Sequence, residues 1–402
     1  MKKILILGGG PNQLSLIRAA KDAGMKVILC DYNPEAPGIP LADRFYRVSI
    51  IDREAVLDVA RNEAVDGVVA NTESVMQIVA FVCESLGLTG NSEESIEKLV
   101  SKKEFRKLQK EQGLFAPDYT EVATVSELYD ALHSMEFPIV IKPSESSGTR
   151  GTAVITGDTK TDSLEETFEK CREFSRNDYV TLENYIPMPS LTVIEGDVFL
   201  NHGEMLWDGM FFTRRSPAAP MIPMTYIFPL SLEREQFIKL KDTLITAFRA
   251  AGISHGQYNV ELFFTESEEL FLIEINARQG GNKIPLAIKY HSGIDMDRLL
   301  VTTAVGDDSY WDDLKTYVRP ERYTIWHLVF PRNTGILQEV QIAEELRDHI
   351  IYEEMFHKPG DLLQNTENAA SCMGYVGLQF DNDEQMKEYA ECLEELIVPV
   401  IL

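Results

Sequence analysis

The stretch LFLIEINARQGG, residues 270–281, combines a hydrophobic strand pattern with polar residues at alternate positions. Glu274, Asn276 and Arg278 are spaced two residues apart, and side chains at that spacing lie on one face of a β-strand. A carboxylate, an amide and a guanidinium therefore line one side of an apolar segment. Burying such a row is costly unless its members are paired or bind something. Taken alone, the row fits either a metal site or a solvated strand edge.

The preceding strand, QYNVELFF at 257–264, adds a second carboxylate. A short polar connection joins the two strands and predicts a hairpin, which brings Glu261 close to Glu274 and Asn276. Two carboxylates that share one space repel each other unless a cation or a proton separates them. Carboxylate and amide oxygens suit Mg²⁺ that keeps waters and bridges phosphates. The alternative is a pair of solvated surface carboxylates, but apolar neighbours on both sides indicate burial and favour the metal site.

The segment FPIVIKPSESSGTRG, residues 137–151, predicts a strand that delivers Lys142 into a loop of small residues. Small residues let a backbone approach a phosphate closely, and hydroxyls and cations then meet its oxygens. The segment lacks the G-K-[ST] of a Walker A loop. The alternative is a plain hairpin loop with an edge lysine. The candidate phosphate-binding residues of the loop are Ser146, Ser147, Gly148, Thr149, Arg150 and Gly151.

A strand end at VTLENYIPMPS, residues 180–190, supplies Glu183 and Ile186 just before two prolines. A carboxylate beside exposed backbone groups suits an adenine amino group and ring edge. The alternative is an ordinary exit from a strand into a loop.

Three further places are candidates for substrate contacts. Arg214 and Arg215 lie in a Pro- and Met-rich stretch, 209–229, that is predicted to form a loop; they either grip a substrate carboxylate or are a solvated pair. Glu73 follows a strand of the first lobe and either receives a substrate amine or is stabilised by a helix N-terminus. The pair at 280–281, Gly280 and Gly281, either lets a substrate approach the backbone or only turns the chain.

Composition limits the classes of partner. The 402 residues carry a formal net charge of −26, from 38 basic and 64 acidic side chains. That balance argues against nucleic acid and anionic membranes as partners. No stretch approaches the roughly 18 consecutive apolar residues of a membrane span. Five scattered cysteines without metal-ligand spacing indicate reduced thiols and a cytoplasmic protein.

The order of patterns predicts several lobes. Strands and helices alternate over the first 90 residues, which is typical of a parallel α/β sheet. Its first turn, LILGGGPNQ, lacks the third glycine of a dinucleotide fingerprint because position 13 is Gln, so a nicotinamide cofactor is disfavoured. From about 115 the strands are predicted to pair in antiparallel fashion, and beyond about 320 the pattern is α/β again. We therefore predict four domains, which comprise residues 1–95, 96–190, 191–320 and 321–402.

The motifs occur in an order that resembles the ATP-grasp superfamily across nearly the whole chain. The resemblance implies an α/β fold with α+β character in the ATP-binding lobes. It implies an N-terminal Rossmann-like pre-ATP-grasp lobe over 1–95, a small lobe over 96–190, a large lobe over 191–320 and a C-terminal α/β cap over 321–402. By resemblance, Lys102 and Lys142 are the two ATP lysines, the glycine-rich loop covers the triphosphate, and Glu183 and Ile186 hold the adenine. The implied metal ligands are Glu261, Glu274 and Asn276, and the implied catalytic residues are Arg278 and Lys142.

Two positions depart from the superfamily pattern. Ser101 precedes the first ATP lysine where an acidic residue is usual, and Ser190 occupies the usual position of a ribose-binding Glu. The residue that binds the ATP ribose is therefore not assigned.

The resemblance also implies a reaction. Two Mg²⁺ ions, or Mn²⁺ in their place, bridge the ATP phosphates; a substrate carboxylate attacks the γ-phosphate, and an amine displaces phosphate from the resulting acyl phosphate. The segment EINARQGGNKIPLAIKYHSGID is most similar to amino-acid and dipeptide ligases and is also similar to the carboxylate–amine ligases of purine synthesis. The leading hypothesis is an amino-acid ligase. The alternatives are a ligase for a nucleotide or sugar metabolite and a non-catalytic ATP-binding protein. A homodimer is a family-level expectation.

Overall fold

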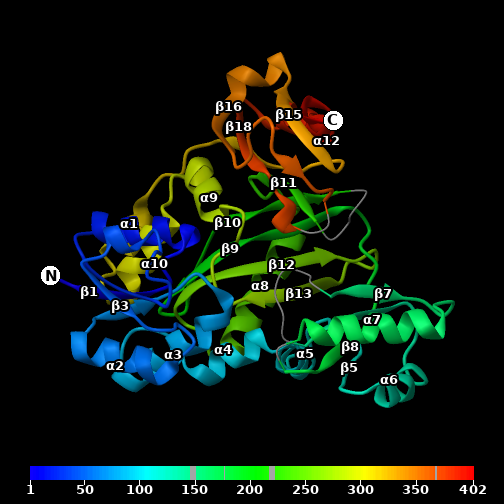
Figure 1. The fold of residues 1–402 in the computed structure, drawn as a ribbon, viewed down its shortest axis with the longest axis horizontal. Coiled ribbons are helices and arrows are strands. Elements are labelled where there is room, and N and C mark those ends of the chain that lie inside the picture. The colour runs from blue at the N-terminus through cyan, green and yellow to red at the C-terminus, as the bar shows by residue number, and fades with distance from the viewer. Residues whose placement is uncertain (145–150, 176, 217–221, 367–368) are drawn as a thin grey trace.

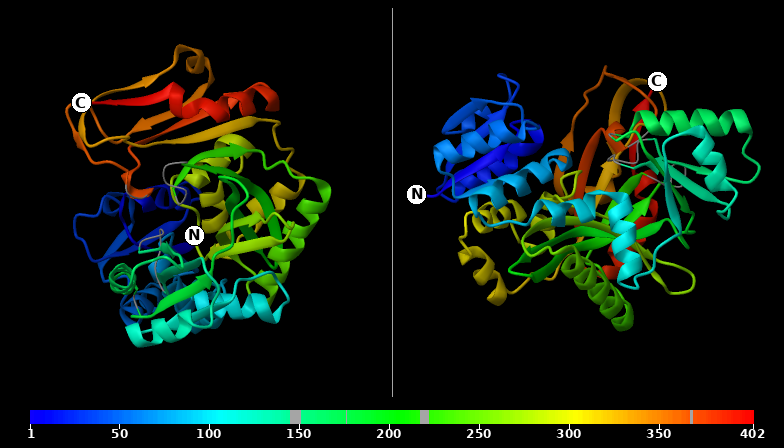
Figure 2. Two further views of the ribbon diagram at one scale, coloured as in Figure 1. Left: turned by 90° about the vertical axis from the view of Figure 1, so that its right-hand side faces the viewer. Right: turned by 90° about the horizontal axis from the view of Figure 1, so that it is seen from below.

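The computed structural model describes residues 1–144, 151–175, 177–216, 222–366 and 369–402. An N-terminal lobe and a small lobe lie at opposite ends of a long central sheet, and the C-terminal strands and helix lie above that sheet in Figure 1. The two additional views in Figure 2 agree with this arrangement. The candidate loop residues Ser146, Ser147, Gly148, Thr149 and Arg150 fall outside the described residues.

The N-terminal lobe is built on a parallel sheet with strand order β3-β2-β1-β4, as the alternating pattern predicts. Strands β1, β2 and β4 are short and mostly apolar because helices cover both faces, whereas the edge strand β3 carries an exposed arginine at each end. The strands are β1 Lys3–Leu7, β2 Lys26–Asp31, β3 Arg44–Arg47 and β4 Gly67–Val69. The α-helices are α1 Leu14–Asp22, α2 Arg53–Glu63 and α3 Met76–Leu86, and the 3₁₀ turns are η1 Pro11–Gln13, η2 Ile39–Leu41 and η3 Glu73–Val75.

One helix from far along the chain completes this lobe. Helix α10, Met296–Ala304, packs against α1, and Val301 and Val305 join the same apolar cluster as Ile4 and Ile6. Figure 1 shows α10 beside α1. The N-terminal sheet is therefore tied to the segment that follows the metal-candidate strands.

The charged stretch after residue 90 forms two helices, α4 Glu93–Val100 and α5 Lys102–Glu111. Ser92 caps α4 by accepting a hydrogen bond from the backbone N–H of Ser95. Ser101 ends α4 and caps α5, because its hydroxyl accepts from the N–H of Glu104. The serine between the two helical patterns thus places Lys102 in the first turn of a helix.

The small lobe is an antiparallel sheet with strand order β5-β8-β6-β7, as predicted. Alternate residues of β6, such as Ile139 and Ile141, pack against Phe168 and Leu182 in a compact core. The strands are β5 Tyr119–Val122, β6 Ile139–Pro143, β7 Ala153–Ile155 and β8 Val180–Asn184, and the helices are α6 Val125–Leu132 and α7 Thr161–Glu173.

The central sheet has eight strands in the order β13-β12-β9-β10-β11-β14-β18-β16, and every neighbouring pair is antiparallel. Helices α8 and α9 pack on it through two apolar clusters. The strands are β9 Thr192–Asn201, β10 Glu204–Arg215, β11 Pro223–Phe228, β12 Gly256–Phe264, β13 Leu270–Asn276, β14 Tyr323–Val329, β16 Ile350–Met355 and β18 Gly374–Phe380. The helices that follow or cover these strands are α8 Arg234–Ala251, α9 Ile284–Ser292 and α11 Ser309–Thr316.

The prediction of a loop over 209–229 is wrong for most of that stretch. Residues up to Arg215 belong to β10, and the residues from Pro223 belong to β11, so Arg214 and Arg215 lie at the end of a strand. Proline is tolerated here because Pro223 is the first residue of its strand, where its missing N–H costs little. Pairing with neighbouring strands overrode the loop-like composition.

The C-terminal part adds a three-stranded sheet, β17-β15-β19, and helix α12, Asp383–Leu396, in line with the α/β pattern predicted beyond about residue 320. The remaining elements are β15 Gly335–Ile342, β17 Leu362–Leu363, β19 Ile397–Ile401, η4 Glu344–His349 and η5 Ala369–Ser371. The central sheet runs without a break across residue 320, so that division of the chain does not coincide with an edge of the sheet, and the domain boundaries stay predictions. Among the helices in the described parts of the chain, none has the length and apolarity needed to cross a membrane.

The close contact of β4 with α10 gives a test of the packing. A Cβ atom added at Gly67 would lie 2.3 Å from the carbonyl oxygen of Ala304. We expect Gly67→Ala to lower the free energy of unfolding by about 1–3 kcal/mol, as overpacking does, measured by urea denaturation. Gly281→Ala is the matched control, because nothing lies within 4 Å of a Cβ at that position. Equal stability of the two variants would contradict the tight packing of β4 on α10.

Candidate active site

Three glutamates form a row across neighbouring strands. Glu261 of β12 is opposite Glu274 of β13 on one side and opposite Glu195 of β9 on the other. Residues directly opposite in antiparallel strands point to the same face of the sheet. Asn276 extends the row, and its amide donates to Glu274 Oε1 at 2.9 Å. The predicted candidates Glu261, Glu274 and Asn276 are therefore brought together, and Glu195 is an additional member.

Arg215 enters this row from β10 and forms an ion pair with Glu261. Burial lowers the pKa of Arg215, while attraction by Glu195 and Glu274 opposes that shift. Arg215 is only 5% exposed, so water screens its charge little. Its guanidinium therefore neutralises part of the negative charge of the glutamate row. The solvated-pair interpretation is therefore wrong for this arginine.

Arg214 points elsewhere. Its guanidinium donates to the carbonyl oxygen of Ala390 at 2.8 Å and pairs with Glu391 at 2.8 Å, both on α12. Successive residues of a strand face opposite sides, so the two arginines cannot both reach the glutamate row. The structure thus gives Arg214 a contact with the C-terminal helix and does not support its assignment to substrate binding.

The carboxylates of the row differ in their tendency to ionise. Burial raises the pKa of Glu195, although a hydrogen bond from Thr213 opposes the shift. Burial also opposes ionisation of Glu274, but attraction by Lys102 and the hydrogen bond from Asn276 outweigh it and lower the pKa. The two carboxyl groups of the row thus have pKa values that are shifted in opposite directions.

The donor set of the row fits a hard divalent cation. Two carboxylates and an amide oxygen leave the remaining positions around Mg²⁺ to water and to phosphate oxygens, which is how this ion is commonly held. Among the described residues, no group of three or more His, Cys, Asp or Glu side chains is placed to hold a metal ion. A metal here would need ligands from outside the protein besides the two carboxylates and the amide oxygen. The residues that would hold it are Glu261, Glu274 and Asn276.

A small cavity of about 20 Å³ connects the row to the two candidate lysines. Lys102 from α5 and Lys142 from β6 line it together with Glu274 and Asn276, and Glu73 of the N-terminal lobe lines it as well. Two cations therefore face the carboxylate–amide row across one cavity. This arrangement is suited to polyphosphate oxygens that also bind a metal.

Glu183 has a different role from the one predicted for its side chain. Lys142 donates to Glu183 Oε2 at 2.7 Å, and Arg106 donates to both carboxylate oxygens, at 2.9 and 3.3 Å. Both oxygens are thus engaged, and the side chain is 3% exposed. The arrangement does not support a contact of the Glu183 carboxylate with an adenine amino group; Glu183 instead positions Lys142. Ile186, half-buried, packs beside the cluster of Phe263 and Phe271.

The ionic cluster shifts the pKa values of its members. Burial alone would raise the pKa of Glu183, but attraction by Arg106 and Lys142 and their hydrogen bonds lower it to about 2. Burial lowers the pKa of Lys142 to about 8, against the attraction of Glu183, and the nearby charges of Arg106 and Lys102 add to the decrease. Lys142 is therefore a cation whose charge is costly to hold without an additional anion.

Arg106 was missed in the sequence, although it is 1% exposed and central to the site. Besides Glu183, it donates to the carbonyl oxygen of Ile273 at 2.8 Å, so it joins α5 and β8 to β13. A signal was available: Arg106 and Gln109 are three residues apart beside the apolar pair Phe105 and Leu108, so both fall on the buried face of α5.

Arg278 faces the N-terminal lobe. Its Nη2 atom lies 3.6 Å from Glu73 Oε2, and its Nη1 donates to the carbonyl oxygen of Gln279 at 2.9 Å. The structure thus brings together Glu73 and Arg278, two candidates that are 205 positions apart in the sequence. Glu73 lines the small cavity at the lysines, whereas Arg278 lines the larger cavity between the N-terminal lobe and β12, so the ion pair lies where the two cavities meet.

The turn after Arg278 is fixed by a buried aspartate that sequence reasoning also missed. The N–H of Gly280 donates to both oxygens of Asp197, at 2.9 and 3.0 Å. A Cβ at Gly280 would lie 2.9 Å from Asp197 Oδ1, whereas Gly281 has open space. Asn282 and Lys283 follow with positive φ angles of 50° and 58°, an uncommon conformation that clusters at functional sites. Gly280 is thus required for packing, and Gly281 is the residue that leaves the backbone accessible.

The glycine-rich turn at the start of the chain has its own partner. The N–H of Gly9 donates to Asp31 Oδ2 at 2.7 Å, and Gln13 donates to Asn71 Oδ1 at 2.6 Å. A carboxylate at the N–H of Gly9 repels a phosphate there. The turn therefore fits a compact strand–helix connection better than a dinucleotide site.

Comparison with known proteins matches two segments of the chain to domain families. Residues 135–285 match the ATP-grasp domain family, and residues 4–87 match the PylC-like N-terminal domain family. The chain contains an ATP-grasp domain. The span of this ATP-grasp domain includes Lys142, Glu261, Glu274, Asn276 and Arg278.

Similar proteins are ligases and related enzymes. The chain is 26% identical over 332 residues to the carbamoyl phosphate synthase large chain of Thermotoga sp. (strain RQ2), covering 76% of this chain and 28% of that protein. It is 25% identical over 290 residues to the formate-dependent phosphoribosylglycinamide formyltransferase of Bacteroides thetaiotaomicron, covering 69% of this chain and 71% of that protein. The chain thus spans little more than a quarter of the length of the carbamoyl phosphate synthase chains it matches.

The fold is shared with solved structures along the whole chain. The L-amino acid ligase from Bacillus licheniformis has a TM-score of 0.82 at 20% identity, with 100% of this chain and 99% of that chain covered. The phosphoribosylglycinamide synthetase from Anaerococcus prevotii has a TM-score of 0.73 at 20% identity, with full coverage of both chains. At this level of identity the likeness establishes the ATP-grasp fold.

The buried ionic cluster gives a test by substitution and pH. Glu183→Gln leaves Arg106 buried without its counter-charge, so we expect a loss of about 3–5 kcal/mol in the free energy of unfolding at pH 7. The folded pKa of Glu183 is lowered from 4.5 to about 2, so its contribution is complete above pH 4.5 and is lost as the pH falls towards 2.

The measurement is urea denaturation of the wild type and the Glu183→Gln variant between pH 7 and pH 3. The difference between the two should shrink as the pH falls. Glu169→Gln, which removes an exposed partner of Arg172, is the control and should cost about 0–1 kcal/mol. A Glu183→Gln variant as stable as this control would show that the cluster contributes nothing.

Proposed function

We propose that this protein is an ATP- and Mg²⁺-dependent ligase that activates a carboxylate as an acyl phosphate and joins it to an amine, with release of ADP and phosphate. The carboxylate substrate is an amino acid in this proposal. The observation that carries the proposal is the single cavity lined by Lys102, Lys142, Glu274 and Asn276, next to the Arg278–Glu73 pair.

Each side chain has a defined task in this reaction. Lys102 and Lys142 bind phosphate oxygens of ATP, and Glu183 and Arg106 hold Lys142 in place. Mg²⁺, held by Glu261, Glu274 and Asn276, supplies neutralisation of phosphate charge. Phosphoryl transfer needs positioning and charge stabilisation rather than a protein nucleophile.

Arg278 and Glu73 act on the substrates. Arg278 stabilises the negative charge that develops as the substrate carboxylate attacks the γ-phosphate and as the amine then attacks the acyl phosphate. Glu73 faces Arg278 and binds the ammonium group of the amino acid. The carboxylate oxygen forms the new bond to phosphorus as the bond to ADP breaks, and the amine later forms the C–N bond as phosphate leaves.

Two observations support an amino-acid substrate. The cation–carboxylate pair Arg278–Glu73 matches the opposite charges of an amino acid. The carboxylate of Asp31 at the N–H of Gly9 disfavours a phosphorylated substrate in the N-terminal turn. The likeness to an L-amino acid ligase over the whole chain is in line with this choice. The alternative, a nucleotide or sugar metabolite as substrate, has support from the similarity to a formate-dependent phosphoribosylglycinamide formyltransferase.

The direct experiment is a phosphate-release screen over pairs of carboxylates and amines with ATP and Mg²⁺. We expect release of phosphate and ADP with amino-acid pairs. Release of AMP and pyrophosphate would overturn the acyl-phosphate mechanism, and turnover only with phosphorylated metabolites would overturn the amino-acid assignment. Tight ATP binding without any turnover would favour a non-catalytic ATP-binding protein. A cytoplasmic location and a homodimer complete the proposal, the first in line with the free cysteines Cys30, Cys83 and Cys171, all of them buried.

The pKa of Lys142 predicts a pH dependence of ATP binding. Its pKa is lowered to about 8 by burial, so the positive charge is lost as the pH rises through that value. We expect the Kd for Mg²⁺-ATP to increase above pH 8 by up to about tenfold per pH unit. Lys142→Arg keeps its charge over this range and should remove the inflection. Calorimetric titrations of the wild type and of Lys142→Arg with Mg²⁺-ATP, from pH 7 to 9.5, measure the two Kd profiles. Identical profiles would contradict the assignment of this pH dependence to Lys142.

Arg278 gives a kinetic test. We expect Arg278→Ala to lower kcat about 10²–10³-fold, as loss of a transition-state donor does. The KM for ATP should change less, because Arg278 pairs with Glu73 and does not line the small cavity that contains Lys102 and Lys142. Arg214→Ala is a matched control, since Arg214 contacts α12, and should keep a kcat near that of the wild type. Equal losses in kcat and in ATP affinity would assign Arg278 to ground-state binding.

A further inference from the structure

Two histidines that are far apart in the sequence face each other at one end of strands β9, β10 and β12. His202 lies in the turn between β9 and β10, and His255 lies directly before β12. The Nε2 atom of His255 lies 3.4 Å from the Nδ1 atom of His202, and the ring centroids are 4.9 Å apart. The side chain of His202 is 63% exposed, so ions from solvent reach the pair. Neither histidine has a task in the proposed function.

The backbone holds both histidines in place. His202 and Gly203 have positive φ angles of 51° and 78°, as in the two-residue turns of tight hairpins. The N–H of Gly203 donates to the carbonyl oxygen of Ser254 at 2.9 Å, which ties this turn to the residue before His255. The side chain of Asn91 accepts from the N–H of His255 at 3.2 Å and donates to its carbonyl oxygen at 2.7 Å. The two rings are therefore carried by fixed segments.

The outer nitrogen of each ring has a polar partner. His202 Nε2 lies 2.8 Å from Asp308 Oδ2, and Asn201 donates to the other oxygen of Asp308 at 2.8 Å. His255 Nδ1 lies 2.8 Å from Ser254 Oγ. Since a carboxylate only accepts, the neutral ring of His202 carries its proton on Nε2 and keeps a lone pair on Nδ1, the atom that faces His255. Metal-binding histidines are commonly held by a carboxylate in this way.

The distance between the inner nitrogens separates two explanations of the pair. Hydrogen bonds from N–H groups commonly span about 2.7–3.2 Å, so 3.4 Å is long for one. Two nitrogens bound at about 2.0–2.1 Å to one tetrahedral Zn²⁺ are about 3.3–3.4 Å apart. Neighbouring nitrogens around a square-planar or octahedral ion with the same bond length would be about 2.8–3.0 Å apart. The observed separation therefore matches the tetrahedral arrangement.

We propose that His202 Nδ1 and His255 Nε2 bind one Zn²⁺ ion. Imidazole nitrogen suits Zn²⁺, whereas Mg²⁺ prefers oxygen, so this site and the glutamate row select different ions. The described residues hold no group of three or more His, Cys, Asp or Glu side chains placed to bind a metal ion, so Zn²⁺ has two protein ligands here and takes water at its other positions. The bound ion joins the turn between β9 and β10 to the segment before β12.

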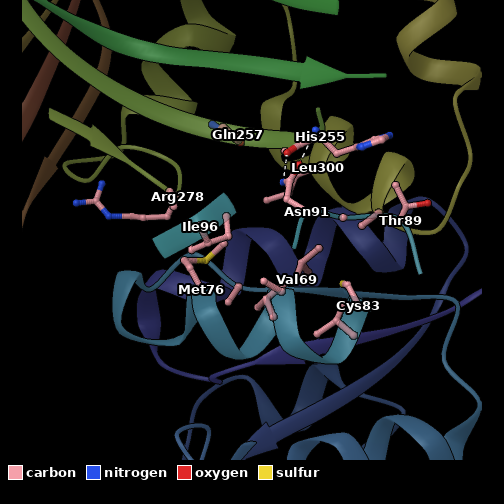
Figure 3. Close-up of a pocket in the computed structure, with 18 of the residues that line it drawn as sticks. Val69, Met76, Cys83, Thr89, Asn91, Ile96, His255, Gln257, Arg278 and Leu300 are labelled. Carbon is pink, nitrogen blue, oxygen red and sulfur yellow. Dashed lines mark hydrogen bonds between the residues drawn. The ribbon is translucent and has the colours of Figure 1, made fainter. Parts of the chain in front are cut away.

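The zinc site lies outside the cavities. His255 lines the cavity between the N-terminal lobe and β12, but Figure 3 shows its imidazole extending away from Met76 and Ile96, which form part of the apolar wall. Arg278, on the other side of this view, points in the opposite direction. The proposed zinc site is therefore separate from the phosphate cavity and does not depend on the proposed ligase activity.

The test is calorimetric titration of the untagged full chain with Zn²⁺, in the presence of excess Mg²⁺ that fills the oxygen sites. We expect one Zn²⁺ to bind per chain. Zinc K-edge X-ray absorption of this complex should show two imidazole nitrogens at about 2.0–2.1 Å from the ion. An absence of Zn²⁺ binding, or a bound Zn²⁺ without two imidazole ligands, would overturn the proposal.

Variants locate the ion. His202→Asn removes one ligand with a residue that tolerates positive φ, and His255→Gln removes the other, so each should weaken Zn²⁺ binding at least tenfold. Asp308→Asn keeps both ligands and should weaken binding about 10–100-fold, as loss of the carboxylate behind a ligating histidine does. The matched control is His357→Gln, because His357 also pairs with a carboxylate, that of Asp361 at 3.5 Å, and it should bind Zn²⁺ as the wild type does.

Equal Zn²⁺ affinities of His202→Asn, His255→Gln and the control would place the ion elsewhere and overturn the proposal. The X-ray absorption spectrum of the wild type decides the matter even where a variant does not fold.

Discussion

The hydrogen-bonded ion pair of Arg106 with Glu183 is the contact on which the geometry of the site depends. Arg106 comes from a helix, Glu183 from the small-lobe sheet, and the backbone carbonyl of Ile273, a second acceptor, from the central sheet. A buried guanidinium needs nearly all its donors satisfied, so these three elements are held at one distance and orientation. Lys142 bonds to the same carboxylate, and its position therefore follows from this contact.

Electrostatic balance extends from this cluster to the glutamate row. Glu195, Glu261 and Glu274 lie side by side on neighbouring strands, and Arg215 neutralises part of their charge. Burial raises the pKa of Glu195, so holding its negative charge inside the protein is costly. A row that is neutralised by only one arginine retains affinity for further positive charge. The site is thus organised as layers of opposite sign, with the lysines facing the carboxylates across a small cavity.

The parts of the site that sequence could predict are those encoded by local periodicity. Glu274, Asn276 and Arg278 share a face because a strand repeats every two residues, and Glu261 joins them through a short hairpin. Glu195 and Asp197 could not be found in this way, because their roles arise from strand order. Helical periodicity marks Arg106 as buried, but it does not show that this residue joins α5 to two sheets. The Pro- and Met-rich segment was predicted to be a loop because its composition is typical of loops. Most of it is strand because β10 pairs with β9 and β11 pairs with β14. The separate roles of Arg214 and Arg215 follow from that difference.

The segment after β13 is fixed by buried hydrogen bonds from two elements. Arg278 faces Glu73, whereas the next residue, Gln279, is hydrogen-bonded to Asp297 of α10. Asp197 of β9 holds the following residue, Gly280, and also accepts a hydrogen bond from Gln257 of β12. The turn after Arg278 is therefore held from the central sheet on one side and from α10 on the other. Since a side chain that stabilises a transition state must be placed within a fraction of an ångström, these buried contacts are the structural support that the proposed chemistry at Arg278 requires.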